Sequence, residues 1–256
     1  MTQFGTRLAS RPPKGDQLRV EGLAMRFGGL RVFDDVTFTL APGEIIGVIG
    51  PNGAGKTTLI NVICGRLAPT AGRIFLGTAD ITARPLHVTS RMGLARSFQQ
   101  TNTFKRATVR ENVSRAIRFS GGGPEVWDRV HGLLERFDLA GRLGDPSDAL
   151  PYGLQKMLGL LLAYATTPRV LLLDEPAAGL ERRERSRVDD FVNHARGELG
   201  CSVLVVEHDM DLIRRLCPRV IVLDAGNVLA EGLPREVLSR RDVIDAYLGT
   251  ADGVAA

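Results

Sequence analysis

The stretch GPNGAGKTT (50–58) has the composition and spacing of a phosphate-binding loop. It fits the pattern GxxxxGK[ST], in which glycines let the backbone fold around phosphates so that successive N–H groups point at anionic oxygens. We expect Lys56 to reach the β- and γ-phosphates of a nucleotide, and the Thr57 hydroxyl to hold Mg²⁺. The predicted nucleotide-binding residues are Gly50, Pro51, Asn52, Gly53, Ala54, Gly55, Lys56, Thr57 and Thr58.

Two adjacent carboxylates in LLLDE (171–175) provide the other groups that such a site requires. Asp174 ends a strongly apolar run, where it can bind Mg²⁺ through water. Glu175 next to it can act as the general base that activates water. Because ligands of open α/β sheets bind at the carboxyl ends of the strands, we expect both carboxylates to lie beside the phosphate loop.

The histidine in VEHD (206–209) is a third candidate. His208 ends another apolar run, so we expect it to open onto the same edge of the sheet as Asp174 and Glu175. There it can donate a hydrogen bond to the γ-phosphate and sense whether that phosphate is present. His208 is therefore predicted to be catalytic, together with Lys56 and Glu175.

The elements around these motifs alternate between strand and helix. The run EIIGVIG (44–50) predicts a buried strand, and TTLINVICGRL (57–67), after the phosphate loop, has the apolar spacing of a helix. Two later apolar strands, RVLLLDE (169–175) and CSVLVVEHD (201–209), are each followed by a helical segment. This alternation predicts a mainly parallel sheet with helices on both faces.

Other regions have different patterns. Alternating apolar residues between 18 and 40 predict antiparallel strands. Apolar residues three and four apart, interrupted by GGGP (121–124), predict a helical insertion over about 89–165. We expect the chain to close with a hairpin around 224–227 and a helix near 235–248.

The composition, 44% apolar and 24% charged, is typical of a soluble globular protein. The net charge of +4 comes from scattered arginines rather than a basic aromatic cluster, which argues against a nucleic-acid partner. Cys64, Cys201 and Cys217 lack CxxC spacing, so we expect buried, reduced thiols in a reducing compartment. No apolar run reaches the roughly 18 residues that span a bilayer, so work at a membrane would need another subunit as anchor.

Taken in order, the motifs resemble those of the ATP-binding subunits of ABC transporters. The resemblance covers about residues 18–249 and rests on GPNGAGKTT, the glutamine of SFQQ, LPYGLQ, LLLDEP, AAGLE and VEHD. It implies an α/β fold of the P-loop NTPase class, the ABC ATPase, with a mainly parallel sheet core, an N-terminal antiparallel β subdomain and an inserted α-helical subdomain. The ATP-binding domain is then expected over 16–251, between a disordered tail at 1–15 and a short tail at 252–256.

The resemblance assigns roles to residues that spacing alone leaves open. Phe27 stands where the family has an aromatic ring that stacks on adenine, although a core phenylalanine at a strand end is the alternative. Gln99 stands where the family has a glutamine that reaches Mg²⁺ and the attacking water. The segment TNTFKRATVRENV (101–113) is expected to form part of the docking surface for a membrane subunit. Phe104 within it fits either a contact site or packing inside the helical insertion.

The stretch LPYGL (150–154) corresponds to the family signature, whose common form is LSGGQ. Family members form head-to-tail dimers in which this signature covers the nucleotide of the other subunit, so Pro151, Tyr152, Gly153 and Leu154 are expected to bind ATP in trans. Pro151 and Leu154 depart from LAYGQ, the usual form in the branched-chain amino acid type. Proline suits a first helical turn, but one hydroxyl and one side-chain amide are lost. We therefore expect a heterodimer in which the site completed by this signature is the weaker one.

Stretches such as MRFGGLRVFDDV, DEPAAGLE, VEHDMDLI and DVIDAYLG are most similar to the branched-chain amino acid uptake type. That similarity implies an ATPase that uses ATP and Mg²⁺ to energise an importer of branched-chain amino acids or a similar small polar solute. The implied partners are integral membrane permease subunits, a second ABC ATPase subunit and a solute-binding protein. The implied location is cytoplasmic, peripheral at the inner face of the plasma membrane. A regulatory ABC protein that binds ATP and a partner with little hydrolysis is the alternative.

Overall fold

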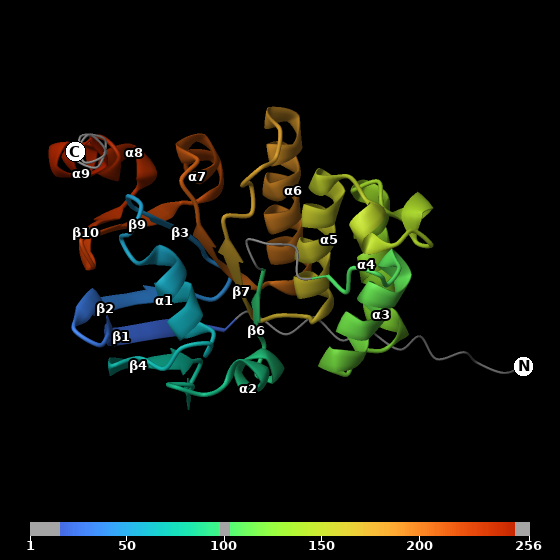
Figure 1. The fold of residues 1–256 in the computed structure, drawn as a ribbon, viewed down its shortest axis with the longest axis horizontal. Coiled ribbons are helices and arrows are strands. Elements are labelled where there is room, and N and C mark those ends of the chain that lie inside the picture. The colour runs from blue at the N-terminus through green and yellow to red at the C-terminus, as the bar shows by residue number, and fades with distance from the viewer. Residues whose placement is uncertain (1–15, 98–102, 249–256) are drawn as a thin grey trace, which may run out of the picture.

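Two sheets and the helices around them make up the structure, a computed structural model that describes residues 16–97 and 103–248 (Figure 1). The strands are β1 Leu18–Phe27, β2 Leu30–Leu40, β3 Ile45–Ile49, β4 Ala71–Leu76, β5 Ala79–Asp80, β6 Leu94–Arg96, β7 Val170–Asp174, β8 Ser202–Val206, β9 Arg219–Asp224 and β10 Asn227–Gly232. The α-helices are α1 Lys56–Ile63, α2 Leu86–Arg91, α3 Val109–Ser120, α4 Pro124–Arg136, α5 Tyr152–Ala165, α6 Arg182–Leu199, α7 Met210–Leu216, α8 Pro234–Val237 and α9 Arg241–Leu248. The predicted tails at 1–15 and 252–256 lie outside the described residues.

The larger sheet has the strand order β10-β9-β3-β8-β7-β6, and all of its strands except the edge strand β10 run parallel. Strands β3, β7 and β8 are buried along their whole length because other elements cover both faces of the sheet. Along β3, Ile45 and Ile49 join the core that includes α5 and α6, whereas Ile46 and Val48 join the core that includes α1 and the smaller sheet. The predicted parallel α/β core is confirmed.

The smaller sheet is antiparallel and has the order β2-β1-β4-β5. Leu18 pairs with Leu40 at one end of the β1–β2 hairpin, and Phe27 pairs with Leu30 at the turn. The predicted antiparallel strands between 18 and 40 are therefore present. The hairpin predicted around 224–227 is confirmed as well, because Asp224 on β9 pairs with Asn227 on β10.

Helices α3, α4 and α5 lie together at one side of the molecule, drawn from green to yellow in Figure 1. The range predicted for the helical insertion, 89–165, also contains β6, which pairs with β7 in the main sheet. The long helices of this range therefore run only from Val109 to Ala165. A strand as short as Leu94–Arg96 cannot show the alternation that would separate it from a helical segment.

The three cysteines are buried and free, as predicted. Burial raises the pKa of the Cys201 and Cys217 thiols to about 12. Such thiols are poorly reactive because the thiolate form is disfavoured. Among the helices that the structure describes, none combines the length and apolar character needed to cross a membrane.

A buried asparagine fixes the start of the helical region. Asn112 on α3 is 1% exposed, and its amide nitrogen donates to the carbonyls of Phe104, Ala107 and Thr108. Its amide oxygen accepts the N–H of Phe104 at 2.8 Å. Thr108 also begins α3 through a capping box with Glu111. Asn112 therefore holds the loop that carries Phe104, together with Ser147, whose hydroxyl donates to the carbonyls of Phe104 and Lys105.

We expect Asn112→Ala to lower the free energy of unfolding by about 1–3 kcal/mol, because buried backbone groups lose their hydrogen-bond partner. Urea denaturation measures this change. Asn193→Ala, at an exposed position of α6, is the matched control and should change the stability by less than about 0.5 kcal/mol. Equal stability of the two variants would contradict the role of Asn112.

Candidate active site

The phosphate loop connects the carboxyl end of β3 to the first turn of α1, as predicted. Gly50, Gly53 and Gly55 all have positive φ angles, of 152°, 83° and 94°. At Gly50 a Cβ atom would lie 2.0 Å from the carbonyl oxygen of Leu223, so no larger residue fits without movement. These conformations turn the loop around the N-terminus of α1, where backbone N–H groups favour an anion.

Lys56 crosses the loop from the start of α1. Its ammonium group donates to the carbonyl of Gly50 at 2.7 Å and to that of Pro51 at 2.9 Å, and the residue is 8% exposed. Burial lowers the pKa of Lys56, while the carboxylates of Glu175 and Asp174 oppose that shift. Lys56, Asp174 and Glu175 therefore lie close enough for their charges to interact, as the sequence predicts.

Asp174 ends β7 and is 1% exposed. The Thr57 hydroxyl donates to its Oδ1 atom at 3.4 Å, so the two predicted Mg²⁺ ligands are adjacent. The Oδ2 atom forms a salt bridge of 2.7 Å with the guanidinium of Arg96, whose side chain is 4% exposed. Arg96 also donates to the side-chain amide oxygen of Asn61 on α1.

Arg96 belongs to none of the motifs that predict the site. It lies 78 residues from Asp174 along the chain and reaches it only because β6 and β7 are neighbours in the sheet. The available signal was an arginine that ends a short apolar run just before SFQQ. A charge that is buried at the end of a strand requires an opposite charge beside it.

Glu175 follows Asp174 in a strained backbone conformation. Its φ angle is 47°, in the left-handed region that non-glycine residues rarely adopt, and its N–H donates to the carbonyl of Val206 at 2.9 Å. Its carboxylate Oε1 lies 3.9 Å from Nδ1 of His208, whose side chain is 61% exposed. The strand ends of β7 and β8 therefore place the predicted base and the predicted histidine together.

An open pocket of about 220 Å³ lies between the phosphate loop and Glu175. It is lined by Val32, Glu175 and residues of the phosphate loop and α1, including Asn52, Lys56 and Thr57. Phe27 ends β1 and is 49% exposed, which the predicted stacking on adenine requires, although it is not among the residues that line this pocket. Gln99 lies outside the described residues.

The donor set suits a nucleoside triphosphate with Mg²⁺. Backbone N–H groups and Lys56 provide positive potential for phosphates, and the oxygens of Thr57 and Asp174 are the hard ligands that Mg²⁺ prefers. Within the described ranges no cluster of three or more His, Cys, Asp or Glu residues could hold a metal by itself. Mg²⁺ typically keeps several waters and uses few protein ligands, which this arrangement allows.

The signature stretch opens α5. Pro151 is the N-cap, with ψ at 147°, and the helix begins at Tyr152, so the proline stands just before the first turn rather than within it. Pro151 stands outside the helix because its ψ angle is extended. Its carbonyl nevertheless accepts the first helical hydrogen bond, from the N–H of Gln155. Tyr152 is 51% exposed, whereas Leu154 packs partly against the core of the helical region. An apolar residue at 154 is therefore explained by packing.

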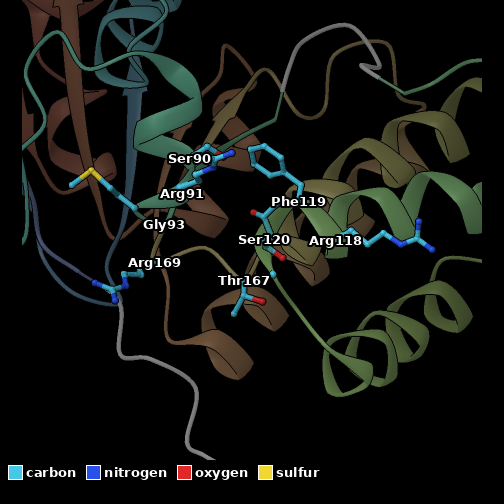
Figure 2. A pocket seen from close by; sticks show the side chains of 11 residues that line it. Ser90, Arg91, Gly93, Arg118, Phe119, Ser120, Thr167 and Arg169 are labelled. Atoms are coloured by element: carbon cyan, nitrogen blue, oxygen red, sulfur yellow. The ribbon is translucent and has the colours of Figure 1, made fainter.

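A second pocket, of about 510 Å³, lies away from the phosphate loop (Figure 2). It is lined by the ends of α2 and α3 and by the loop that precedes β7. Figure 2 shows Phe119 on α3 facing Ser90 and Arg91 at the end of α2, while Arg118 points away. No local sequence pattern predicts this pocket, because it is formed by three segments that are far apart along the chain.

Two family models and several known proteins match this chain. Residues 33–178 match the family described as ABC transporter, and residues 227–253 match the family described as branched-chain amino acid ATP-binding cassette transporter. The chain is 38% identical over 250 residues to the high-affinity branched-chain amino acid transport ATP-binding protein LivG of Escherichia coli K12, covering 91% of this chain and 98% of LivG.

Two further similarities support the same family. The lipopolysaccharide export system ATP-binding protein LptB of Escherichia coli K12 is 32% identical over 234 residues, with 91% of this chain and 97% of LptB covered. The crystal structure of the MJ1267 ATP-binding cassette in its ADP conformation superimposes with a TM-score of 0.82 at 28% identity, over 91% of this chain and 99% of that chain. The chain therefore belongs to the ABC transporter family, as an ATP-binding subunit that hydrolyses ATP to drive transport.

Proposed function

We propose that this protein energises an importer of branched-chain amino acids or a similar small polar solute. The similarity to LivG and the match of residues 227–253 support the amino acid class. LptB belongs to an export system, but its sequence is only 32% identical to this chain, whereas that of LivG is 38% identical. The observation that carries the ATPase chemistry is the convergence of Lys56, Asp174, Glu175 and His208 at one edge of the main sheet.

In the proposed site the phosphate loop and Lys56 hold the phosphates of ATP, and the exposed ring of Phe27 stacks on adenine. Thr57 and Asp174 would hold Mg²⁺, which neutralises phosphate charge when bound, and Gln99 is the further residue that we propose for contact with Mg²⁺ and the attacking water. Glu175 accepts a proton from the attacking water, while His208 donates a hydrogen bond toward the γ-phosphate. The first turn of α5, with Pro151, Tyr152, Gly153 and Leu154, covers the ATP of a second ATPase subunit.

Glu175→Gln should retain ATP binding and reduce hydrolysis by at least about a hundredfold, because the amide cannot accept the proton of water. In the complete transporter, purified from its native membrane and placed in vesicles, the same variant should stop ATP-dependent uptake of radiolabelled leucine. Unchanged turnover would show that Glu175 is not the base. Hydrolysis by the natural complex without uptake of leucine, isoleucine or valine would contradict the proposed substrate class.

The salt bridge between Arg96 and Asp174 generates a second prediction. Arg96→Met leaves a buried carboxylate without its cation, which should lower the free energy of unfolding of the nucleotide-free protein by about 3–5 kcal/mol. MgATP should stabilise this variant more than the natural protein, because Mg²⁺ restores positive charge next to Asp174. Urea denaturation with and without MgATP measures both effects.

The matched control is Arg187→Met. Arg187 forms a 2.8 Å ion pair with Asp138, but the two side chains are 33% and 69% exposed. An exposed pair contributes at most about 1 kcal/mol, so this variant should stay close to the natural protein. If the two variants lost equal stability, Arg96 would have no special relation to the proposed Mg²⁺ ligand.

We also propose that the permease docks on the surface formed by Phe104, Arg115 and Phe119. Phe104 is 59% exposed, which excludes the alternative that it packs inside the helical region. The Arg115 guanidinium lies 4.6 Å from the centre of its ring, and Phe119 follows one helical turn later on the same side of α3. This side leads to the 510 Å³ pocket of Figure 2, where an apolar side chain of the permease would contact Phe119.

Phe104→Ala should reduce the amount of permease that copurifies with this subunit by about tenfold, as expected for an aromatic contact at an interface centre. ATP binding should not change. Leu248→Ala, at a 61% exposed position of α9, is the control and should leave the complex intact. Copurification of Phe104→Ala at the natural level would place the permease elsewhere.

The same purification tests the remaining partners. The proposed complex contains two permease subunits and a second, related ABC ATPase, with a solute-binding protein in the same system. A heterodimer is favoured because Pro151 and Leu154 supply neither the hydroxyl nor the amide of the common signature. The subunit would then lie at the cytoplasmic face of the plasma membrane, attached through the permease.

A further inference from the structure

The signature helix α5 touches the loop that follows β7 at two points. The hydroxyl of Tyr152, the first residue of α5, donates to the carbonyl of Ala178 at 3.3 Å. The ammonium group of Lys156, one helical turn later, donates to the carbonyl of Glu175 at 3.3 Å. Residues four apart share one face of a helix, so both contacts come from a single face of α5.

The loop fits closely against this face. Gly179 has a φ angle of 76°, and a Cβ atom there would lie 2.8 Å from the ring of Tyr152. The carbonyl of Glu175, which accepts from Lys156, also accepts the N–H of Ala178 at 3.1 Å. The strained conformation of Glu175 is therefore maintained partly by a side chain of α5.

Lys156 is an unusual residue for this position because it is charged and 4% exposed. Burial lowers its pKa, and the carboxylates of Glu207, Glu175 and Asp174 oppose that shift. Glu207 is 1% exposed and accepts the N–H groups of Ala177 at 2.8 Å and of His208 at 3.1 Å. Lys156 thus holds the loop after β7, and Glu207 joins that loop to the start of the loop after β8.

We propose that Tyr152 and Lys156 are positioning residues that couple the two ATP sites of the dimer. The N-terminus of α5 contacts the nucleotide of the other subunit, and the same helix holds the backbone of this subunit's own base, Glu175. A shift of α5 when the opposite site fills or empties is transmitted to the carbonyl of Glu175 directly by Lys156. It is also transmitted through Ala178, whose carbonyl accepts from Tyr152 and whose N–H donates to the same Glu175 carbonyl. This inference rests on the proposed dimeric ATPase.

The test is Lys156→Met in the complete transporter. Its kcat for ATP hydrolysis should fall about ten- to a hundredfold with little change in the KM for ATP, because Glu175 is misplaced while the phosphate loop is intact. The Hill coefficient for ATP should fall toward one, because the two sites no longer communicate. Unchanged kcat and unchanged cooperativity would overturn the proposal.

A second variant separates positioning from charge balance. Lys156→Met combined with Glu207→Gln removes both buried charges, so it should recover the thermal stability that Lys156→Met loses. If Lys156 positions Glu175, kcat and cooperativity stay low in the double variant compared with Glu207→Gln alone. If they return to the level of Glu207→Gln, Lys156 only balances charge and the proposal is wrong.

Tyr152→Phe tests the other contact without removing a charge, and it should lower cooperativity as well. Tyr164→Phe is its matched control, since Tyr164 lies on the same helix and its buried hydroxyl has no hydrogen-bond partner among the described residues. Equal effects of the two variants would contradict the role of Tyr152. Failure of the proposed function is recognised separately, because natural protein and Glu175→Gln would then hydrolyse ATP at the same rate.

Discussion

Buried charge at the carboxyl edge of the main sheet is the constraint on which the rest of the site depends. Asp174 and Glu207 are each 1% exposed, and three cations reach this edge from different elements: Lys56 from α1, Arg96 from β6 and Lys156 from α5. A buried carboxylate is costly unless it is paired and hydrogen-bonded. The elements that carry these cations must therefore keep their places in the sheet and around it.

This constraint connects the phosphate loop with the signature helix α5. The chain has only four lysines, and two of them, Lys56 and Lys156, are buried next to Asp174 and Glu175. Lys56 belongs to the subunit's own phosphate loop, whereas Lys156 belongs to the signature helix. In the proposed dimeric ATPase, the carboxylates shared between these two elements provide a physical route by which one ATP site affects the other.

Much of the site could be predicted from the sequence because its residues follow each other in short motifs. GPNGAGKTT, LLLDE and VEHD each contain a strand end with its functional residues, so local spacing was sufficient to name Lys56, Asp174, Glu175 and His208. The parallel core and the antiparallel hairpin were predicted for the same reason, since period and burial are local properties. Strand β6 was missed because three residues are too few to show a period.

The sequence by itself determined the hairpins β1–β2 and β9–β10, the buried strands β3, β7 and β8, the phosphate loop and the identity of the candidate catalytic groups. These features are local, because backbone conformation and apolar period are set by neighbouring residues. Only the tertiary structure decided which distant charges meet there. Arg96 reaches Asp174 across 78 positions, and Lys156 reaches the carbonyl of Glu175 across 19. Such contacts depend on strand order and helix packing, for which no local pattern exists, and they arise when the main sheet and the helical region assemble.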